Sequence, residues 1–332
     1  MLNRWNAAIE KRMAFVTPAC LVFGVLFPEI AGKGLPLVPV MFAVMTFIGA
    51  LKSGFRDVGR VFQNPLPLLL AVLFLHVIMP AAAWGAGHLF FSDHPDLITG
   101  IVLEFTVPAA VVGVMWVSIY QGNQSMALSL VVLDTVLAPF VIPATLHVLV
   151  GTKVEMDPVE MMQELVFMIA LPAVAAMCLN QLSGGRIRES WPPRLAFFSK
   201  LCLIFVVTAN SSKVAPYIRH LTGERVAAAL CILILAASGY LLGYGAAAVL
   251  GMDRENKVSV MYGAGMRNIS AGAVIAAEYF PGEVLFPVMI GTLFQQVLAA
   301  TLGTLLFSKG RESGRKNGTA AGRQKGVVRH ES

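Results

Sequence analysis

Residues 257–280 read KVSVMYGAGMRNISAGAVIAAEYF, an apolar window of membrane-spanning length with an arginine near its centre. The segment GAGMRN at 263–268 combines two glycines, which weaken a helix, with a permanent cation. About 20 apolar residues cross the hydrocarbon core as a helix, and a charge at that depth is costly. Irregular backbone and charge together at membrane depth are typical of a broken helix that faces protein or a wet cavity instead of lipid.

The composition of the whole chain predicts a membrane protein. Its 332 residues are 57% hydrophobic and 13% charged, against roughly 45–50% and about 25% in soluble domains. One soluble core of this length cannot bury so many apolar side chains and still keep a polar surface. A soluble domain and a disordered chain are both excluded, and the lipid bilayer is the expected surrounding.

Ten apolar windows lie between Pro, Gly and charged punctuation, so the sequence predicts a polytopic, all-α integral membrane protein. The windows are 13–31, 35–51, 65–90, 97–120, 124–150, 160–182, 195–218, 226–250, 257–280 and 284–308. They form one transporter domain over residues 1–308. Residues 309–332 are rich in Gly, Lys and Arg and are predicted to be a disordered, basic cytoplasmic tail.

Charge distribution predicts the orientation and excludes other classes. Most of the 25 Lys and Arg residues fall on the side of the predicted windows that also holds both termini, so both termini are expected in the cytoplasm and the protein in the cytoplasmic membrane. The net charge of +6 therefore needs no nucleic-acid partner. The four cysteines lie in apolar stretches without paired spacing, which indicates free thiols and neither a metal site nor a cofactor. The chain has no HExxH, GxSxG, P-loop or CxxC motif, so an enzyme is not expected.

An even count of ten windows permits two inverted five-helix repeats, 13–150 and 160–308. The fourth and ninth windows then correspond, and both are interrupted, by Pro108-Ala109-Ala110 and by the 263–268 segment. Matching broken spans indicate a binding site between the repeats of a transporter. The alternative is that Pro and Gly only kink helices that face lipid.

Ionisable residues within the windows are candidates for substrate binding and charge coupling. Arg267 offers a fixed cation to an anionic substrate, because a guanidinium stays charged and matches a carboxylate. Asn268 and Ser270 follow it at the start of the second half-helix, whose dipole attracts negative charge. The alternative role for Arg267 is a buried ion pair with Asp134 that holds two helices together.

Three further residues lie near these positions in the predicted topology. Glu104 precedes Pro108 by one helical turn, and its alternative to a coupling role is a silent, protonated carboxyl. His76 precedes Met79-Pro80 and is either a core histidine or a proton carrier. Lys213 is expected to snorkel to the membrane surface, with a cavity-lining role as the alternative.

The order of several motifs resembles the bile acid:sodium symporter family from about residue 13 to 308. These motifs are MPAAAW at 79–84, Pro108, YQGN at 120–123, Pro139 and Pro143, and GMRN at 265–268. The resemblance implies ten helices, with a panel domain of the first, second, sixth and seventh spans and a core domain of the other six. It also implies that the fourth and ninth helices unwind and cross, and that organic anions bind beside the crossing.

The chain departs from that family at the positions whose side chains bind sodium there. These positions are occupied here by Leu75, Gly113, Val114, Ala127, Val131, Gly263 and Arg267. Sodium needs oxygen ligands, which these side chains do not supply, so we expect degenerate sodium sites and no bound metal. Arg267 then acts as a tethered cation in place of a bound one.

The prediction is a sodium-independent transporter of a small or amphipathic organic anion that works by alternating access. A tethered cation returns with the carrier and supplies no driving force. The protein is then a uniporter, an anion exchanger or a carrier coupled to protons through Asp134, Glu104 or His76. Two alternatives stay open: a sodium symporter that uses backbone carbonyls as ligands, and a membrane ligand sensor that does not transport.

Overall fold

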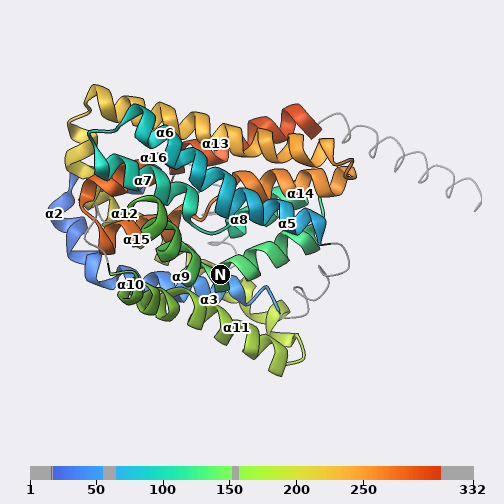
Figure 1. Ribbon diagram of the computed structural model, residues 1–332. Coiled ribbons are helices and arrows are strands. Elements are labelled where there is room, and N and C mark those ends of the chain that lie inside the picture. The colour runs from blue at the N-terminus through green and yellow to red at the C-terminus, as the bar shows by residue number, and fades with distance from the viewer. Residues whose placement is uncertain (1–15, 17, 55–64, 152–156, 308–332) are drawn as a thin grey trace, which may run out of the picture.

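The computed structural model describes residues 16, 18–54, 65–151 and 157–307, and all named elements in these ranges are helical (Figure 1). The predicted tail at 309–332 lies outside the described residues. The elements are α2 (Pro28–Ala31), η1 (Gly32–Leu37), α3 (Val38–Ala50), α5 (Leu66–Leu73), η2 (Phe74–Ile78), α6 (Met79–Phe90), α7 (Pro95–Thr106), α8 (Val111–Ile119), α9 (Gln124–Leu149), α10 (Pro158–Leu165), η4 (Val166–Ala170), α11 (Leu171–Leu182), α12 (Arg186–Arg219), α13 (Gly223–Val249), α14 (Arg254–Gly265), α15 (Ile269–Tyr279) and α16 (Gly282–Phe307).

Seven runs of helix in the described ranges are long and apolar enough to cross a membrane. They are Pro28–Ala50, Leu66–Phe90, Gln124–Leu149, Pro158–Leu182, Arg186–Arg219, Gly223–Val249 and Gly282–Phe307. The structure is therefore that of an all-helical, multi-pass membrane protein.

The first two predicted windows, 13–31 and 35–51, meet at a turn. Residues 32–34 lie in Gly32–Leu37, a 3₁₀ turn that joins α2 to α3, and Pro28–Ala50 forms one apolar run. Short 3₁₀ turns often connect helices in this way. Residues 18–26 form a further helix ahead of α2.

Two other apolar stretches are each split into two helices at the predicted positions. The first stops at Thr106 and resumes at Val111, and Val107, whose ψ is 153°, is extended. A residue before proline is driven from helical into extended backbone, which accounts for the break ahead of Pro108. The second stretch stops at Gly265 and resumes at Ile269, with Met266 extended at ψ 129°.

The split helices lie in the interior of the bundle. Every residue from Leu97 to Thr106 in α7 is buried, and so are most of the residues of α15. Helix α7 packs between α6 and α16, α14 packs along α13, and α12 packs along α3 (Figure 1). The breaks are consequently shielded from lipid, where unpaired backbone groups are not tolerated.

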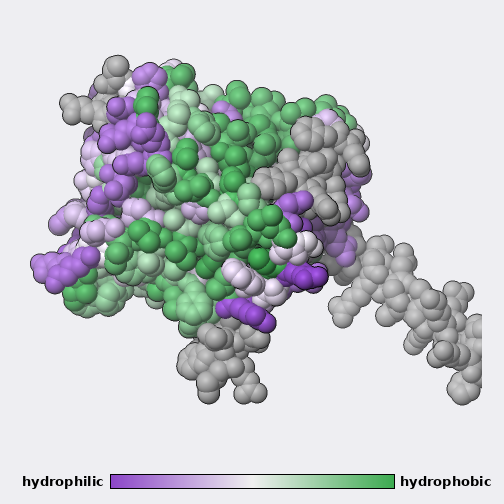
Figure 2. Space-filling model, turned by 90° about the horizontal axis from the view of Figure 1, so that it is seen from below, coloured by the Kyte–Doolittle hydropathy of each residue, from purple (hydrophilic) through white to green (hydrophobic). Residues whose placement is uncertain are grey.

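The surface of the bundle is apolar around its middle. Figure 2 shows a green hydrophobic band between hydrophilic residues gathered at the two ends of the molecule. Large apolar side chains on the outside of this band include Leu69, Phe167, Ile234 and Val297. Such a surface fits the hydrocarbon core of a bilayer.

Candidate functional site

The two broken helices meet through their extended segments. Ala109 and Arg267 face each other in an isolated antiparallel bridge. The backbone N–H of Asn268 donates to the carbonyl of Pro108 at 2.7 Å, and that of Ala110 donates to the carbonyl of Met266 at 3.4 Å. This crossing, residues 107–110 and 266–268, pairs backbone groups that the missing helical turns leave free.

Arg267 lies in the interior of the crossing with 2% of its surface exposed. Its backbone N–H donates to Gln295 Oε1 at 2.8 Å, and its Nη1 donates to the carbonyl of Ala264 at 2.9 Å. Its Nε and Nη2 are buried and have no hydrogen-bond partner within the described residues. These two nitrogens form one edge of the guanidinium, the edge that binds a carboxylate through two parallel hydrogen bonds.

Asp134, at mid-length of α9, supports the opposite strand of the crossing and is 1% exposed. Its Oδ2 accepts the backbone N–H of Ala109 at 2.5 Å. His76 Nε2 lies 2.7 Å from Asp134 Oδ1, close but not aligned as a hydrogen bond. The described residues contain no ion pair between Asp134 and Arg267 within 4.0 Å. Asp134 nevertheless lies beside Arg267, because Ala109, which donates to Asp134, is the bridge partner of Arg267.

Glu104 is the second buried acid beside the crossing, with 3% of its surface exposed. Its Oε1 lies against Gly291 of α16, where a Cβ atom would approach it to 2.1 Å. Its Oε2 has no hydrogen-bond partner in the described part of the chain. Glu104 therefore occupies a space that only glycine leaves open.

The two other predicted binding residues begin α15. The Asn268 side chain accepts the backbone N–H of Ala271 at 3.3 Å and caps the helix. Ser270 lies half-buried in the first turn. The structure thus brings Arg267, Asn268 and Ser270 together at one helix N-terminus, where backbone N–H groups favour an anion.

Lys213 does not snorkel to the surface in this structure. Its Nζ donates to the carbonyl of Ala277 near the end of α15. A cation at the carboxyl end of a helix is favourable, so this contact ties α12 to α15.

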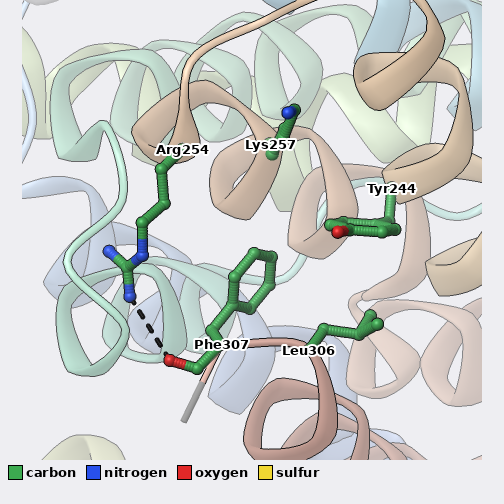
Figure 3. Close-up of a pocket in the computed structure, with 5 residues that line it drawn as sticks. All are labelled: Tyr244, Arg254, Lys257, Leu306 and Phe307. Carbon is green, nitrogen blue, oxygen red and sulfur yellow. Dashed lines mark hydrogen bonds between the residues drawn. The ribbon is translucent and has the colours of Figure 1, made fainter. Parts of the chain in front are cut away.

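A surface pocket of about 280 Å³ lies at one end of the bundle, away from the crossing (Figure 3). Its lining is Tyr244, Arg254, Lys257, Leu306 and Phe307. Arg254 Nη2 donates to the carbonyl of Phe307 at 3.5 Å across it. The pocket contains none of the predicted site residues.

Comparison with known proteins identifies the family. Residues 38–221 match the Sodium Bile acid symporter family. The chain is 38% identical over 294 residues to the uncharacterized protein YbaS of Bacillus subtilis, a match that covers 89% of this chain and 96% of YbaS. The chain belongs to the sodium bile acid symporter family. It is a multi-pass membrane transporter of a small organic substrate and not an enzyme.

More distant members carry functional names. The chain is 20% identical to the uncharacterized sodium-dependent transporter YocS of B. subtilis, over 85% of this chain and 87% of YocS. It is 22% identical to the probable sodium/metabolite cotransporter BASS1, chloroplastic, of Arabidopsis thaliana, over 87% of this chain and 71% of that protein. Both names include sodium, an ion that needs oxygen ligands from the protein that binds it.

At the expected sodium positions of this protein, apolar side chains pack against one another. Leu75, Val131 and Val114 pack in one apolar cluster together with Ala109 and Leu130 of the crossing region. A Cβ at Gly263 would lie 2.8 Å from Leu130 Cδ2 and 3.2 Å from Ala71 Cβ, so apolar side chains pack closely around this glycine. Ala127 belongs to a second apolar cluster with Met266 and Tyr262, and Gly113 faces Met266. Side chains of this kind offer no oxygen to sodium, and the residues present do not fit a bound ion.

Sequence reasoning missed one residue of the site. Gln295 Oε1 accepts the backbone N–H of Arg267, and the carbonyl of Gln295 accepts the Tyr240 hydroxyl at 3.3 Å. Nothing in the apolar run around Gln295 marks it, because its partner is backbone from another helix. Tyr240 packs under the break, where a Cβ at Gly265 would lie 2.4 Å from its ring.

Proposed function

We propose that this protein moves an organic anion across the cytoplasmic membrane by alternating access, without sodium, and with Arg267 as a tethered cation. The proposed architecture has ten spans in two inverted five-helix repeats, 13–150 and 160–308, with both termini in the cytoplasm. A panel of the first, second, sixth and seventh spans supports a core of the other six.

The free edge of Arg267 carries this proposal. Nη1 and the backbone N–H hold the residue in place, while Nε and Nη2 have no partner in the described residues. A buried guanidinium edge without hydrogen bonds is costly, and a substrate carboxylate satisfies both nitrogens at once. The dipole of α15 adds to the attraction at the same place.

The apolar cluster at Leu75, Val114 and Val131 supports the sodium-independent part. A water molecule can replace one missing sodium ligand, but a packed aliphatic cluster has room for neither the ion nor water. Arg267 also places a positive charge at one of the family's sodium positions, which repels a second cation.

The test is uptake into proteoliposomes with three radiolabelled probes, the monocarboxylate pyruvate, the dicarboxylate succinate and the amphipathic anion taurocholate. We expect uptake of at least one probe to be equal in sodium chloride and in choline chloride. Uptake that requires sodium contradicts the proposal and restores sodium symport. Binding of a probe without any flux contradicts transport and favours a ligand sensor.

Arg267 variants test the binding role with the same probes. Arg267→Gln is expected to weaken probe binding about 30-fold or more, since removal of one partner of a buried charge pair costs at least about 2 kcal/mol. Lys257→Gln, which removes a cation outside the crossing, is the matched control and is expected to bind and transport normally. Unchanged binding in Arg267→Gln rules out the tethered-cation role.

A further inference from the structure

Four ionisable side chains surround the crossing. Arg267, Asp134 and Glu104 are 2%, 1% and 3% exposed, and the His76 side chain, at 13%, contacts Asp134. A net charge in such an interior is expensive, so the group as a whole tends to stay neutral. The charge of each bound substrate must therefore be balanced within the same group.

The empty site can be neutral with His76 uncharged. Arg267 and Asp134 then balance each other, since both are held at Ala109, which donates to Asp134 and pairs with Arg267 in the bridge. Glu104 is protonated in this arrangement, because no base lies within 4.0 Å of it in the described chain and its Oε2 is buried without a partner. The ionised Asp134 and the neutral His76 are the groups left that can take up a proton, and of the two an imidazole is ordinarily the stronger base.

Binding of a carboxylate to Arg267 removes this balance. Arg267 then pairs with the substrate, and the charge of Asp134 is left without a compensating cation. One proton on His76 restores neutrality, because a protonated His76 forms an ion pair with Asp134 at the 2.7 Å separation already present.

Resting on the proposed function, we infer that His76 is the coupling site and that each carboxylate crosses the membrane together with one proton bound to His76. The proton binds to the imidazole when the anion binds to Arg267, and both leave on the other side. Transport of a monocarboxylate is then electroneutral, and the proton gradient takes the role that sodium has in other members of the family.

The local structure suits this role for His76. His76 lies in the π-turn η2, one helical turn before Pro80. In a regular α-helix the proline ring would clash with the carbonyl four residues earlier, which is that of His76. Single π-turns of this kind are frequent at functional sites. His76 Nδ1 is buried and has no hydrogen-bond partner among the residues described, so one ring nitrogen is available.

The helices around η2 carry further ionisable groups. The helices that pack against η2 are α5, α6, α7 and α14, and α5 carries no ionisable residue. Glu104 and Tyr262 lie within α7 and α14, Asp134 lies on α9, and Tyr240 of α13 packs at the break that precedes Arg267. The remaining ones lie at helix ends and are His88, Asp96, Arg254, Glu255 and Lys257.

The experiment measures proton movement with the probes named above. Proteoliposomes contain a trapped pH-sensitive dye, and probe is added outside at equal pH. We expect the lumen to acidify as the probe enters. At steady state, each unit of inward proton gradient is expected to raise pyruvate accumulation about tenfold, because one pH unit equals 1.36 kcal/mol per proton.

His76→Gln separates coupling from folding. His76→Gln leaves the charge of Asp134 uncompensated in the loaded site, so it is expected to slow exchange and to lose both lumen acidification and gradient-driven accumulation. The double variant His76→Gln, Asp134→Asn has a neutral loaded site and is expected to keep the exchange of internal for external probe without acidification. His147→Gln is the control, since His147 is exposed on the same helix as Asp134. Wild-type acidification in His76→Gln overturns the inference, and so does loss of exchange in a folded double variant.

Glu104→Gln identifies which group carries the proton. The variant mimics a protonated Glu104 and is expected to keep probe-coupled acidification. If Glu104→Gln loses acidification and His76→Gln retains it, the proton is carried by Glu104, and the inference is overturned. Uptake that depends on Arg267 but not on pH refutes the coupling alone, whereas no uptake of any probe refutes the proposed function and the coupling with it.

Discussion

Arg267 is anchored by its backbone and by one of its three side-chain nitrogens, so its free edge is held in a fixed direction. Nη1 is bound to Ala264 of the preceding turn, and Gln295 holds the backbone N–H. A binding group that is already ordered loses little conformational entropy when its ligand arrives. The same anchoring explains how a charge at this depth is tolerated in the absence of a direct ion pair.

We expect Asp134 to reduce how strongly Arg267 attracts an anion. In Asp134→Asn the amide oxygen can still accept the Ala109 N–H, whereas the negative charge that competes with substrate for Arg267 is lost. We expect probe affinity to rise up to about tenfold, an effect near 1.4 kcal/mol, and the return of the empty carrier to slow. Equilibrium binding and the comparison of exchange with net uptake measure the two effects.

The control for Asp134→Asn is Asp96→Asn, which neutralises an acid at the start of α7, away from the crossing. It is expected to leave both measurements unchanged. If Asp134→Asn and wild type have equal probe affinity and equal net uptake, Asp134 does not compete with substrate for Arg267.

Gly291 is predicted to be intolerant of any side chain. Gly291→Ala places a methyl 2.1 Å from Glu104 Oε1, in a buried position that cannot expand freely. Overpacking of this kind costs about 1–3 kcal/mol, so the melting temperature in detergent should fall. Gly245→Ala in α13, where a Cβ has no neighbour within 4 Å, should leave it unchanged or raise it slightly. Equal melting of the two variants contradicts the packing of Glu104 against Gly291.

At the scale of elements, the two breaks and the starts of the half-helices after them form the site. Val107 and Met266 leave helical geometry, and the freed backbone groups bind across the crossing. Helix α15 then starts with Asn268 as its cap. The crossing thus orders both Arg267 and the N-terminus of α15, where we propose that the anion binds.

Asn268 variants separate capping from substrate binding. Asn268→Ala removes the cap and is expected to lower the free energy of unfolding by about 0.5–2 kcal/mol. Asn268→Asp keeps the cap but adds a negative charge next to Arg267, so stability should be retained while probe uptake falls. Melting curves and uptake assays on the same preparations measure both quantities. Lower uptake in Asn268→Ala without lower stability shows direct substrate binding by Asn268 instead.

At the scale of the whole molecule, the apolar band requires that successive loops lie on opposite sides of the membrane. In the proposed topology, Leu182 at the end of α11 faces the cytoplasm and Leu221 after α12 faces outward. Both side chains are exposed, at 84% and 59%. Without the four native cysteines, Leu221→Cys is expected to react with an impermeant maleimide on intact cells. Leu182→Cys is expected to react only after lysis, and the reverse pattern inverts the orientation.

Sequence patterns predicted the broken helices well, because Pro108 and the 263–268 segment disfavour helix through local sterics alone. They also located the buried charges, since any ionisable residue within a long apolar window is costly and easily recognised. They did not show that the junction at 32–34 is a 3₁₀ turn, whose flanking helices pack on α12. Gln295 was missed because its role depends on a backbone group that is distant in sequence.

The sequence by itself determined the membrane environment, the family and the position of Arg267 in a broken span, since hydropathy and local backbone preference need no tertiary contact. Only the tertiary structure decided the partners of the charges. Asp134 contacts Ala109 and His76, and the Nε and Nη2 edge of Arg267 is left free. The physical reason is that hydrogen bonds and ion pairs act over a few ångströms, so their formation depends on how α9, the π-turn and the two breaks approach one another.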